Sequence, residues 1–300
     1  MRDWKRTDSV EIEKFLGLLL MMGILKKPLI AQYWSKNPLY STPLFGSVMS
    51  QNRFQLLLSM LHFNDNTQQL SRDDPLRDKL FKLSFRPVVD HLFEHFQLMY
   101  SMSQNVCIDE SLLLWKGRLH FKQYIPIKRS RFGVKLFKLC ENSSGYIYRF
   151  RVYVGKDSLL QFPPGVPQPP TQFGPTERVV WFLMLPILKK GHHLYVDNYY
   201  TSIPLFTALL NEGTGACGTI RANRRGYPQQ LVRRKQRPGE TSSLCSGALL
   251  AQKFTDKDGH MLSTVHEPNF RSVTSRRRVS VTIDKPVCVL EYNTNMGGVD

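Results

Sequence analysis

The sequence predicts a mixed α+β fold in which a helical region precedes a βββαβαβ core, and a small β-rich insertion interrupts that core. Apolar residues recur at helical spacing through the first hundred residues. From about Gln104 the apolar period becomes strand-like, and beyond residue 221 a Gly-, Ser- and Arg-rich stretch breaks the α/β rhythm. We therefore divide the chain into a helical region (1–103), a core (104–221), an insertion (222–285) and a return to the core (286–300).

Three helices are expected in the helical region. Asp8 and Glu11 form a capping box before the first helix. Ser50 can cap the second, which carries apolar residues on one face. A third is expected from Arg77 to Met99, broken or kinked at Pro87.

The core is expected to contain five strands and two helices. The expected strands are Val106–Trp115, Gly133–Cys140, Tyr146–Gly155, His193–Tyr199 and Gly215–Arg221. The first expected helix is capped by Thr176 and continues to Leu188. The second is Ile203–Asn211, which Gly213 ends. Three meandering strands followed by right-handed crossovers give a mixed sheet, with the first strand central and beside the fourth. That topology is the core of the ribonuclease H-like fold.

The inserted stretch, 222–285, carries a few strand-like pieces such as His260–His266 and Val279–Ile283. It can be a small β-rich subdomain or a partly mobile arm.

Composition favours a partner of negative charge. The net charge is +17 with 42% hydrophobic residues, and polyanion binding is the usual reason for so basic a folded chain. The alternative is that balancing acidic segments lie outside this sequence. Five cysteines without a CxxC pair argue against a disulfide scaffold or zinc knuckle and indicate a reducing, intracellular setting. The longest apolar run, Phe15 to Leu25, is too short to span a bilayer, so no membrane association is expected.

Two aspartates, Asp109 and Asp197, interrupt apolar runs that are typical of buried strands, and Asp300 follows a Gly-Gly turn. A carboxylate at the end of a buried strand is costly unless a cation or hydrogen bonds compensate it. The topology can set Asp109 and Asp197 side by side, which suggests a Mg²⁺ site for phosphoryl transfer. For either residue alone, a turn or capping role is the ordinary interpretation.

Neighbouring polar residues are expected to play lesser roles. Glu110 should point to the other face of its strand and act as a structural ion-pair partner. Asn198 can assist a metal, although bonding a turn backbone is the commoner role. Tyr124, Tyr199 and Tyr200 can stack on bases, with core packing as the default.

Basic residues cluster around the aspartates in the sequence. A charge run is usually a solvated face, but a DNA-cutting site needs cations around its anionic ligands, which favours phosphate contact. The candidate DNA-binding residues are Lys116, Arg118, Lys122, Lys128, Arg129, Arg131, Lys135, Arg221, Arg224 and Arg225.

The motifs around these residues resemble the piggyBac family of transposases and the domesticated genes derived from them. The first block runs from Ile108-Asp109-Glu110 through Lys122 to Lys128, and the second is Asp197 to Leu205. The third comprises Met261 to His266, Lys285-Pro286 and Met296 to Asp300. The resemblance covers nearly the whole chain, although Arg129 stands where the family often has proline.

The resemblance implies a ribonuclease H-like catalytic core with a metal-binding triad of Asp109, Asp197 and Asp300 and two Mg²⁺ ions. It implies cut-and-paste transposition at TTAA targets through hairpin intermediates, a homodimer when full length, and a nuclear location. Because the sequence stops at Asp300, without the helix and Cys-rich tail that follow in the family, we expect this chain not to transpose. Two alternatives stay open: a domesticated, non-catalytic DNA- or chromatin-binding protein, and a stand-alone structure-selective nuclease.

Overall fold

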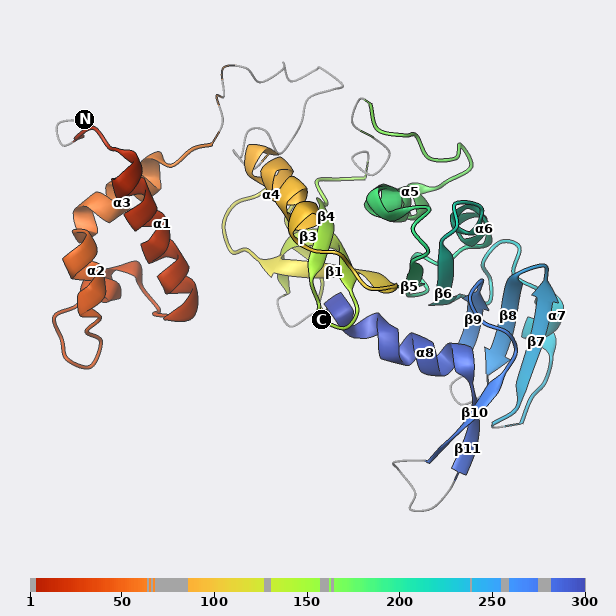
Figure 1. Ribbon diagram of the computed structural model, residues 1–300. Coiled ribbons are helices and arrows are strands. Elements are labelled where there is room, and N and C mark those ends of the chain that lie inside the picture. Colours follow the sequence, from red (N-terminus) through yellow and green to blue (C-terminus); the bar gives the residue numbers. More distant parts are fainter. Residues whose placement is uncertain are drawn as a thin grey trace. The chain divides into compact units, whose positions relative to one another are not determined.

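The computed structural model describes residues 4–63, 65, 67, 86–126, 131–156, 162, 165–237, 239–254, 259–274 and 282–299. The chain divides into two compact units, Met1–Val88 and Val89–Asp300 (Figure 1).

The first unit is a small helical assembly made of α1 (Ser9–Ile24), η1 (Ile30–Trp34), α2 (Pro43–Val48) and α3 (Gln51–Met60). Both expected caps form: Asp8 accepts a hydrogen bond from the Glu11 amide, and Ser50 accepts one from the Arg53 amide. A cluster of buried residues fills the space between the helices, comprising Phe15, Leu18, Tyr33, Phe45, Met49, Phe54 and Leu57.

Helix α4 (Arg86–Met99) packs with the second unit. The Phe93 ring lies 4.9 Å from the Phe150 ring on the strand β4 (Ile147–Val152). Pro87 stands in the first turn of the helix, where its fixed φ suits a helix start, so the expected kink does not occur in the described helix. Residues 77–85 of the expected helix lie outside the described residues.

A nine-stranded mixed sheet forms the centre of the second unit. Its order is β2-β3-β1-β5-β6-β9-β8-β7, with β4 paired to β3. The central strand β1 pairs antiparallel with β3 and parallel with β5, and β5 is parallel to β6. The predicted mixed sheet with its first strand central is thus confirmed. The strands are β1 (Asn105–Leu114), β2 (Gln123–Tyr124), β3 (Phe132–Glu141), β4 (Ile147–Val152), β5 (His193–Val196), β6 (Gly215–Thr219), β7 (Thr241–Ser246), β8 (Leu249–Phe254) and β9 (Gly259–Ser263).

Part of the stretch expected as an insertion continues this sheet. After the short helix α7 (Gln229–Arg233), strands β7, β8 and β9 add to the edge of β6, because β9 pairs antiparallel with β6. Strands β10 (Phe270–Thr274) and β11 (Thr282–Pro286) form a separate two-stranded sheet.

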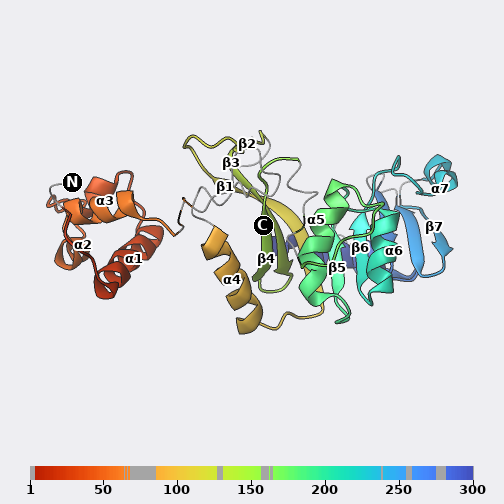
Figure 2. The same ribbon diagram turned by 90° about the horizontal axis from the view of Figure 1, so that it is seen from above.

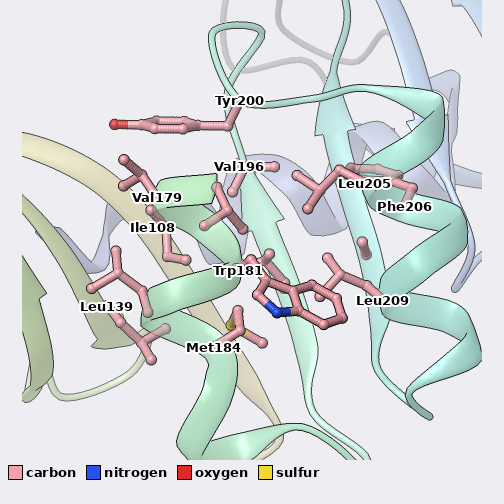
Figure 3. Close-up of a cluster of buried hydrophobic side chains, with 14 of the residues drawn as sticks. Ile108, Leu139, Val179, Trp181, Met184, Val196, Tyr200, Leu205, Phe206 and Leu209 are labelled. Atoms are coloured by element: carbon pink, nitrogen blue, oxygen red, sulfur yellow. The ribbon is translucent and has the colours of Figure 1, made fainter. Parts of the chain in front are cut away.

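One face of the large sheet is covered by α5 (Pro175–Met184), η5 (Leu185–Ile187) and α6 (Ile203–Asn211). In Figure 1, α5 and α6 lie on one side of β5 and β6 and α8 lies on the other, and Figure 2 shows α5 and α6 from above. Side chains from α5 and α6 interleave with those of the strands (Figure 3), among them Ile108, Leu139, Val179, Val196, Leu205 and Phe206.

The start of α5 corrects one expectation. Its N-cap is Gly174, not Thr176, because Pro175 occupies the first turn and the Glu177 carboxylate accepts a hydrogen bond from the Gly174 amide at 2.6 Å. Helix α6 has the predicted bounds, and Gly213 follows it with a φ of 61°, the left-handed conformation that glycine adopts without strain.

The opposite face is covered by α8 (Val287–Asn295) and the turn η6 (Met296–Val299). Successive residues of a strand point to opposite faces. Cys107 therefore faces α8 while Ile108 faces α5, and a second buried cluster forms under α8 from Cys107, Cys140, Tyr195, Cys217, Met261 and Cys288. The five cysteines are free thiols, four of them buried. Among the helices that the structure describes, none is long and apolar enough to cross a membrane.

Candidate functional site

The two strand-borne aspartates occupy matching positions on neighbouring parallel strands. Ile108 of β1 is in register with Val196 of β5, and Asp109 and Asp197 are the next residue on each strand. Because β1 and β5 are parallel and in register up to Ile108 and Val196, the backbone brings these two residues, far apart in sequence, to one place. Both are partly buried.

The ordinary turn interpretation also applies to Asp197. Its side chain accepts a hydrogen bond from the Tyr199 amide at 2.9 Å, and its carbonyl accepts one from the Thr201 amide at 3.1 Å. In the same way, the Asp109 side chain accepts a bond of 2.8 Å from the Glu110 amide. Each carboxylate is thereby oriented by the backbone beside it.

The site disfavours negative charge on Asp197. Burial raises the pKa of this carboxyl, and the neighbouring charge of Glu110 raises it further, while the Tyr199 amide and the Arg221 guanidinium act in the opposite direction. The balance is a raised pKa, which means that the described surroundings do not fully compensate the carboxylate.

Glu110 lies on the α5 face, as the alternation along the strand predicts. The Tyr200 hydroxyl donates to its carboxylate at 3.0 Å, and the Lys135 ammonium lies 3.9 Å from the other carboxylate oxygen. Tyr200 is fully buried, so it is a core residue and not a stacking platform. Lys135 also lies over the rings of Phe137 and Tyr199, at 4.8 and 5.2 Å from their centres.

Tyr292 also lies near these residues, although the sequence assigns it no chemical role of its own. Burial raises the pKa of its hydroxyl, a hydrogen bond with Thr219 lowers it, and the charges of Asp197 and Asp109 raise it again. The tyrosine therefore lies within electrostatic reach of both aspartates. It comes from α8, within the stretch that the sequence predicts to return to the core.

The turn that precedes Asp300 packs against β1 and β3 beside the site. A Cβ atom added to Gly298 would lie 2.8 Å from the Cys107 sulfur and 2.8 Å from the Glu141 carbonyl oxygen, so only glycine fits there without displacing a neighbour. Cys107 and Asp109 share a face of β1, so the turn lies on the face that carries Asp109.

Asp300 itself lies outside the described residues, as do Lys128 and Arg129. Within the part of the chain that the structure describes, no group of three or more His, Cys, Asp or Glu side chains could hold a metal ion. What the strand register brings together is a pair of acidic residues, Asp109 and Asp197.

The first group of predicted DNA-binding residues surrounds the end of the β1–β3 pair at which Leu114 lies opposite Gly133. We call this antiparallel pair, with the segment that connects its strands, the β1–β3 hairpin. Lys116, Arg118 and Arg131 are exposed, and Lys122 is half-buried. Lys135 differs from them, because its ammonium is engaged with Glu110 and two aromatic rings.

The second group lies beside Asp197. Arg221 donates to the Asn198 side chain at 3.1 Å, and Arg224 donates to the carbonyls of Asn198 and Tyr199 at 2.8 and 2.9 Å. Asn198 is therefore held by hydrogen bonds from two arginines, whereas the sequence predicts that its side chain bonds to the backbone of its turn. Arg225 is exposed.

The donor set fits a hard divalent cation. Mg²⁺ prefers oxygen ligands and commonly uses one or two carboxylates, with water and phosphate oxygens completing its shell. Asp109 and Asp197 supply two such groups where the pairing of β1 with β5 ends, and the raised pKa of Asp197 reflects incomplete compensation of its charge.

Comparison with known proteins shows which class of transposase the chain belongs to. A family model described as "Transposase IS4" matches residues 1–300, which places the chain among the DDE transposases. The chain belongs to the piggyBac family of these IS4-like transposases, as its motifs indicated.

Similar proteins include the human "PiggyBac transposable element-derived protein 3", 26% identical over 97% of this chain and 49% of its own length. The human "PiggyBac transposable element-derived protein 2" is 25% identical over 71% of this chain and 34% of its own length. A solved structure, "Cryo-EM structure of piggyBac transposase synaptic complex with hairpin DNA", aligns with a TM-score of 0.76 and 28% identity, over 99% of this chain and 58% of that one. The chain thus spans about half the length of the first of these relatives.

Proposed function

We propose that this chain carries the ribonuclease H-like catalytic core of a piggyBac-type transposase, or of a protein derived from one, that cleaves and transfers DNA strands. The observation that supports this most strongly is the matched placement of Asp109 and Asp197 at the point where the parallel pairing of β1 with β5 ends. The family match and the mixed sheet support the same function.

In this proposal Asp109, Asp197 and Asp300 hold divalent metal, with Asp300 following the turn on β1. Bound Mg²⁺ would supply activation of the attacking oxygen and stabilisation of the leaving oxygen. Other residues of the chain position these aspartates. The Tyr199 amide orients Asp197, and Arg221 and Arg224 hold the loop after it.

DNA is the proposed substrate and partner. The exposed basic residues around the hairpin and Arg225 would contact phosphates on either side of the carboxylates. TTAA targets, hairpin intermediates, a homodimer and a nuclear location are parts of the proposal that rest on the resemblance to the family.

A non-catalytic DNA- or chromatin-binding role is the second candidate. It is favoured by the human relatives, which are named as transposable element-derived proteins, and by the hydrogen bonds that give both aspartates a structural role as well. The two candidates differ in one property, metal-dependent strand cleavage.

Cleavage of a plasmid that carries matched transposon ends, in Mg²⁺ or Mn²⁺, separates them. We expect metal-dependent nicking by the chain and a loss on the order of 10³-fold in Asp109→Asn and Asp197→Asn, because each removes a metal ligand. Asp90→Asn, an exposed aspartate on α4, is the matched control and should cleave normally. DNA binding with no cleavage by the wild-type chain in either metal would favour the non-catalytic role.

A further inference from the structure

Five large apolar side chains are exposed at the end of the β1–β3 pair near Leu114 and Gly133. Four of them share one face of the sheet, while Leu114 points to the other face. Leu113 is 58% exposed, Trp115 41%, Phe132 48% and Tyr124 56%. We refer to these four, which are three aromatic residues and Leu113, as the aromatic track. A folded chain usually covers aromatic rings of this size, so their exposure together indicates a binding surface.

The aromatic track lies on the same face of the sheet as Asp109. Asp109 is opposite Lys138, Leu113 is opposite Val134, and Tyr124 is opposite Phe132. Because residues two apart share a face, Leu113 and Trp115 follow Asp109 on β1, and Phe132 precedes Lys138 on β3. Six residues of strand separate Asp109 from Trp115, a distance of about 20 Å at ~3.3 Å per residue.

Local contacts hold the rings in place. The Tyr124 and Phe132 rings lie 4.6 Å apart and are tilted by 32°, and the Lys122 ammonium is 5.7 Å from the centre of the Phe132 ring. The Trp115 indole folds over Gly117, where a Cβ atom would lie 2.8 Å from the indole nitrogen. Fixed rings lose little conformational entropy when a flat partner stacks on them.

The charge around the aromatic track selects the partner. Residues 111–140 contain eight lysines and arginines and no aspartate or glutamate. A second copy of this chain would bring the same positive charges against these, which opposes self-association through this surface. A partner that offers both flat apolar rings and negative charge is nucleic acid with unpaired bases, since paired bases are stacked inside the duplex.

We propose that the aromatic track binds the unpaired bases of a DNA strand that leads to or from the Asp109–Asp197 site. This inference rests on the proposed function, and it adds that the hairpin distinguishes single-stranded from double-stranded DNA. Lys116, Arg118 and Lys122 hold the phosphates of that strand, and Tyr124 and Phe132 stack on its bases.

The test measures binding in EDTA, so that it does not depend on cleavage. Fluorescence anisotropy compares a labelled oligothymidylate with a duplex of the same length, for the wild-type chain, Tyr124→Leu, Phe132→Leu and the double variant. Leucine keeps the site apolar but removes the ring. We expect each single variant to bind the single strand about 5- to 150-fold more weakly, because base stacking on an aromatic ring contributes that much per base, and to bind the duplex within about twofold of wild type.

Phe270→Leu is the matched control, because Phe270 is a strand aromatic of 51% exposure outside the aromatic track. It should leave both affinities unchanged. A 2-aminopurine base in the oligonucleotide provides a second readout, since stacking quenches its fluorescence in the wild-type chain and not in the double variant. Circular dichroism establishes that each variant is folded.

Unchanged single-strand affinity and unchanged quenching in the folded double variant would overturn the inference. So would a wild-type dimer that the double variant converts to a monomer without altering DNA binding, because the aromatic track would then be a protein interface. Neither result touches the proposed function, which fails instead if the wild-type chain shows no metal-dependent cleavage.

Discussion

At the scale of the residue, the most informative group is a carboxyl in an unfavourable place. Asp197 could be exposed like most aspartates, yet it lies partly buried beside Asp109 and within reach of the charge of Glu110. A pKa that is raised in the folded state means that the ionised carboxylate destabilises the fold at neutral pH. A chain keeps such a group where binding compensates the cost.

Replacing Asp197 by asparagine should therefore stabilise the metal-free chain. The raised pKa contributes stability only below the unfolded pKa and is a net cost at pH 7, and Asp197→Asn removes that cost while its carbonyl can still accept from the Tyr199 amide. We expect a higher midpoint in thermal unfolding in EDTA, by about 2–4 °C for each kcal/mol recovered. Adding Mn²⁺ should raise the midpoint of the wild-type chain and leave that of Asp197→Asn unchanged.

Glu94→Gln, which changes an exposed carboxylate on α4, serves as the control, and its midpoint should equal that of wild type with and without metal. A destabilised Asp197→Asn would mean that the turn it caps outweighs the cost of its charge. In that case the residue would be structural first.

Glu141 is the opposite case, a buried carboxylate that its surroundings stabilise. Burial would raise the pKa of Glu141, but hydrogen bonds from Ser144, Tyr100 and Ser103 lower it to about 2. A lowered pKa contributes stability above the unfolded value of about 4.5, and this is lost as the pH falls toward about 2.

Glu141→Gln should destabilise the second unit at neutral pH by about 1–3 kcal/mol, since it keeps the shape and loses the charge-assisted bonds. Urea unfolding at a series of pH values measures this. The difference from wild type should be largest at pH 7 and should shrink as the pH falls below about 4.5. A difference that does not vary with pH would show that the charge is not the cause.

At the scale of the element, α8 and the turn η6 complete the site. His266 fastens α8 to the end of β9, because its ring accepts or donates at 2.9 Å to the Ser263 hydroxyl and at 2.9 Å to the Glu291 carboxylate. The arrangement has the order of a hydrolase triad, but Ser263 is fully buried and cannot reach a substrate. The three residues are a tether that places Tyr292 near the aspartates.

These elements mark the limit of what the sequence could predict. The helices, the mixed sheet and the pairing of Asp109 with Asp197 follow from local periodicity and from the handedness of crossovers. The continuation of the sheet through β9, β8 and β7 does not, since antiparallel pairing across a long separation leaves no local signature. The bonds from Arg224, which the sequence places among the DNA-binding candidates, to the Asn198 and Tyr199 carbonyls could not be predicted for the same reason, because these contacts form only in the folded chain.

Gly298→Ala should displace the turn η6 from β1. The added methyl meets the Cys107 sulfur and the Glu141 carbonyl at 2.8 Å, and backbone atoms cannot move aside cheaply. We expect a loss of about 1–3 kcal/mol and faster reaction of the buried Cys107 thiol with a disulfide reagent. The exposed Cys245 should first be replaced by serine, so that it does not dominate the reaction.

Gly297→Ala is the matched control, because nothing lies within 4 Å of a Cβ atom at that position. The two variants differ by one position in the same turn. Equal thiol reactivity in both would show that the turn tolerates the methyl and that its contact with Cys107 does not hold it.

At the scale of the whole molecule, a net charge of +17 is distributed unevenly between residues that fold the chain and residues available to a partner. Lys135 is engaged with Glu110, and Arg224 holds the loop after Asp197. Lys116 and Arg118 are exposed at the hairpin. The sequence presents all four as equivalent members of basic clusters, and only their contacts in the folded chain distinguish them.

This division predicts how salt acts on DNA binding. Each phosphate contact releases counterions, so the logarithm of the affinity falls with the logarithm of salt concentration by about 0.9 per contact on duplex DNA. The wild-type chain should therefore lose affinity steeply as salt rises. Lys116→Ala and Arg118→Ala should each reduce the slope by about 1 and weaken binding to all sequences alike, because they remove a phosphate contact.

Lys135→Ala should leave the slope unchanged and lower the thermal midpoint instead, because it removes the cation that lies beside the half-buried Glu110. Anisotropy titrations over a range of salt concentrations, paired with thermal unfolding of each variant, measure both quantities. If Lys135→Ala reduced the slope as much as Lys116→Ala did, the ammonium of Lys135 would have to leave Glu110 to reach a phosphate. The β1–β3 hairpin of the protein would then change its side-chain contacts when DNA binds.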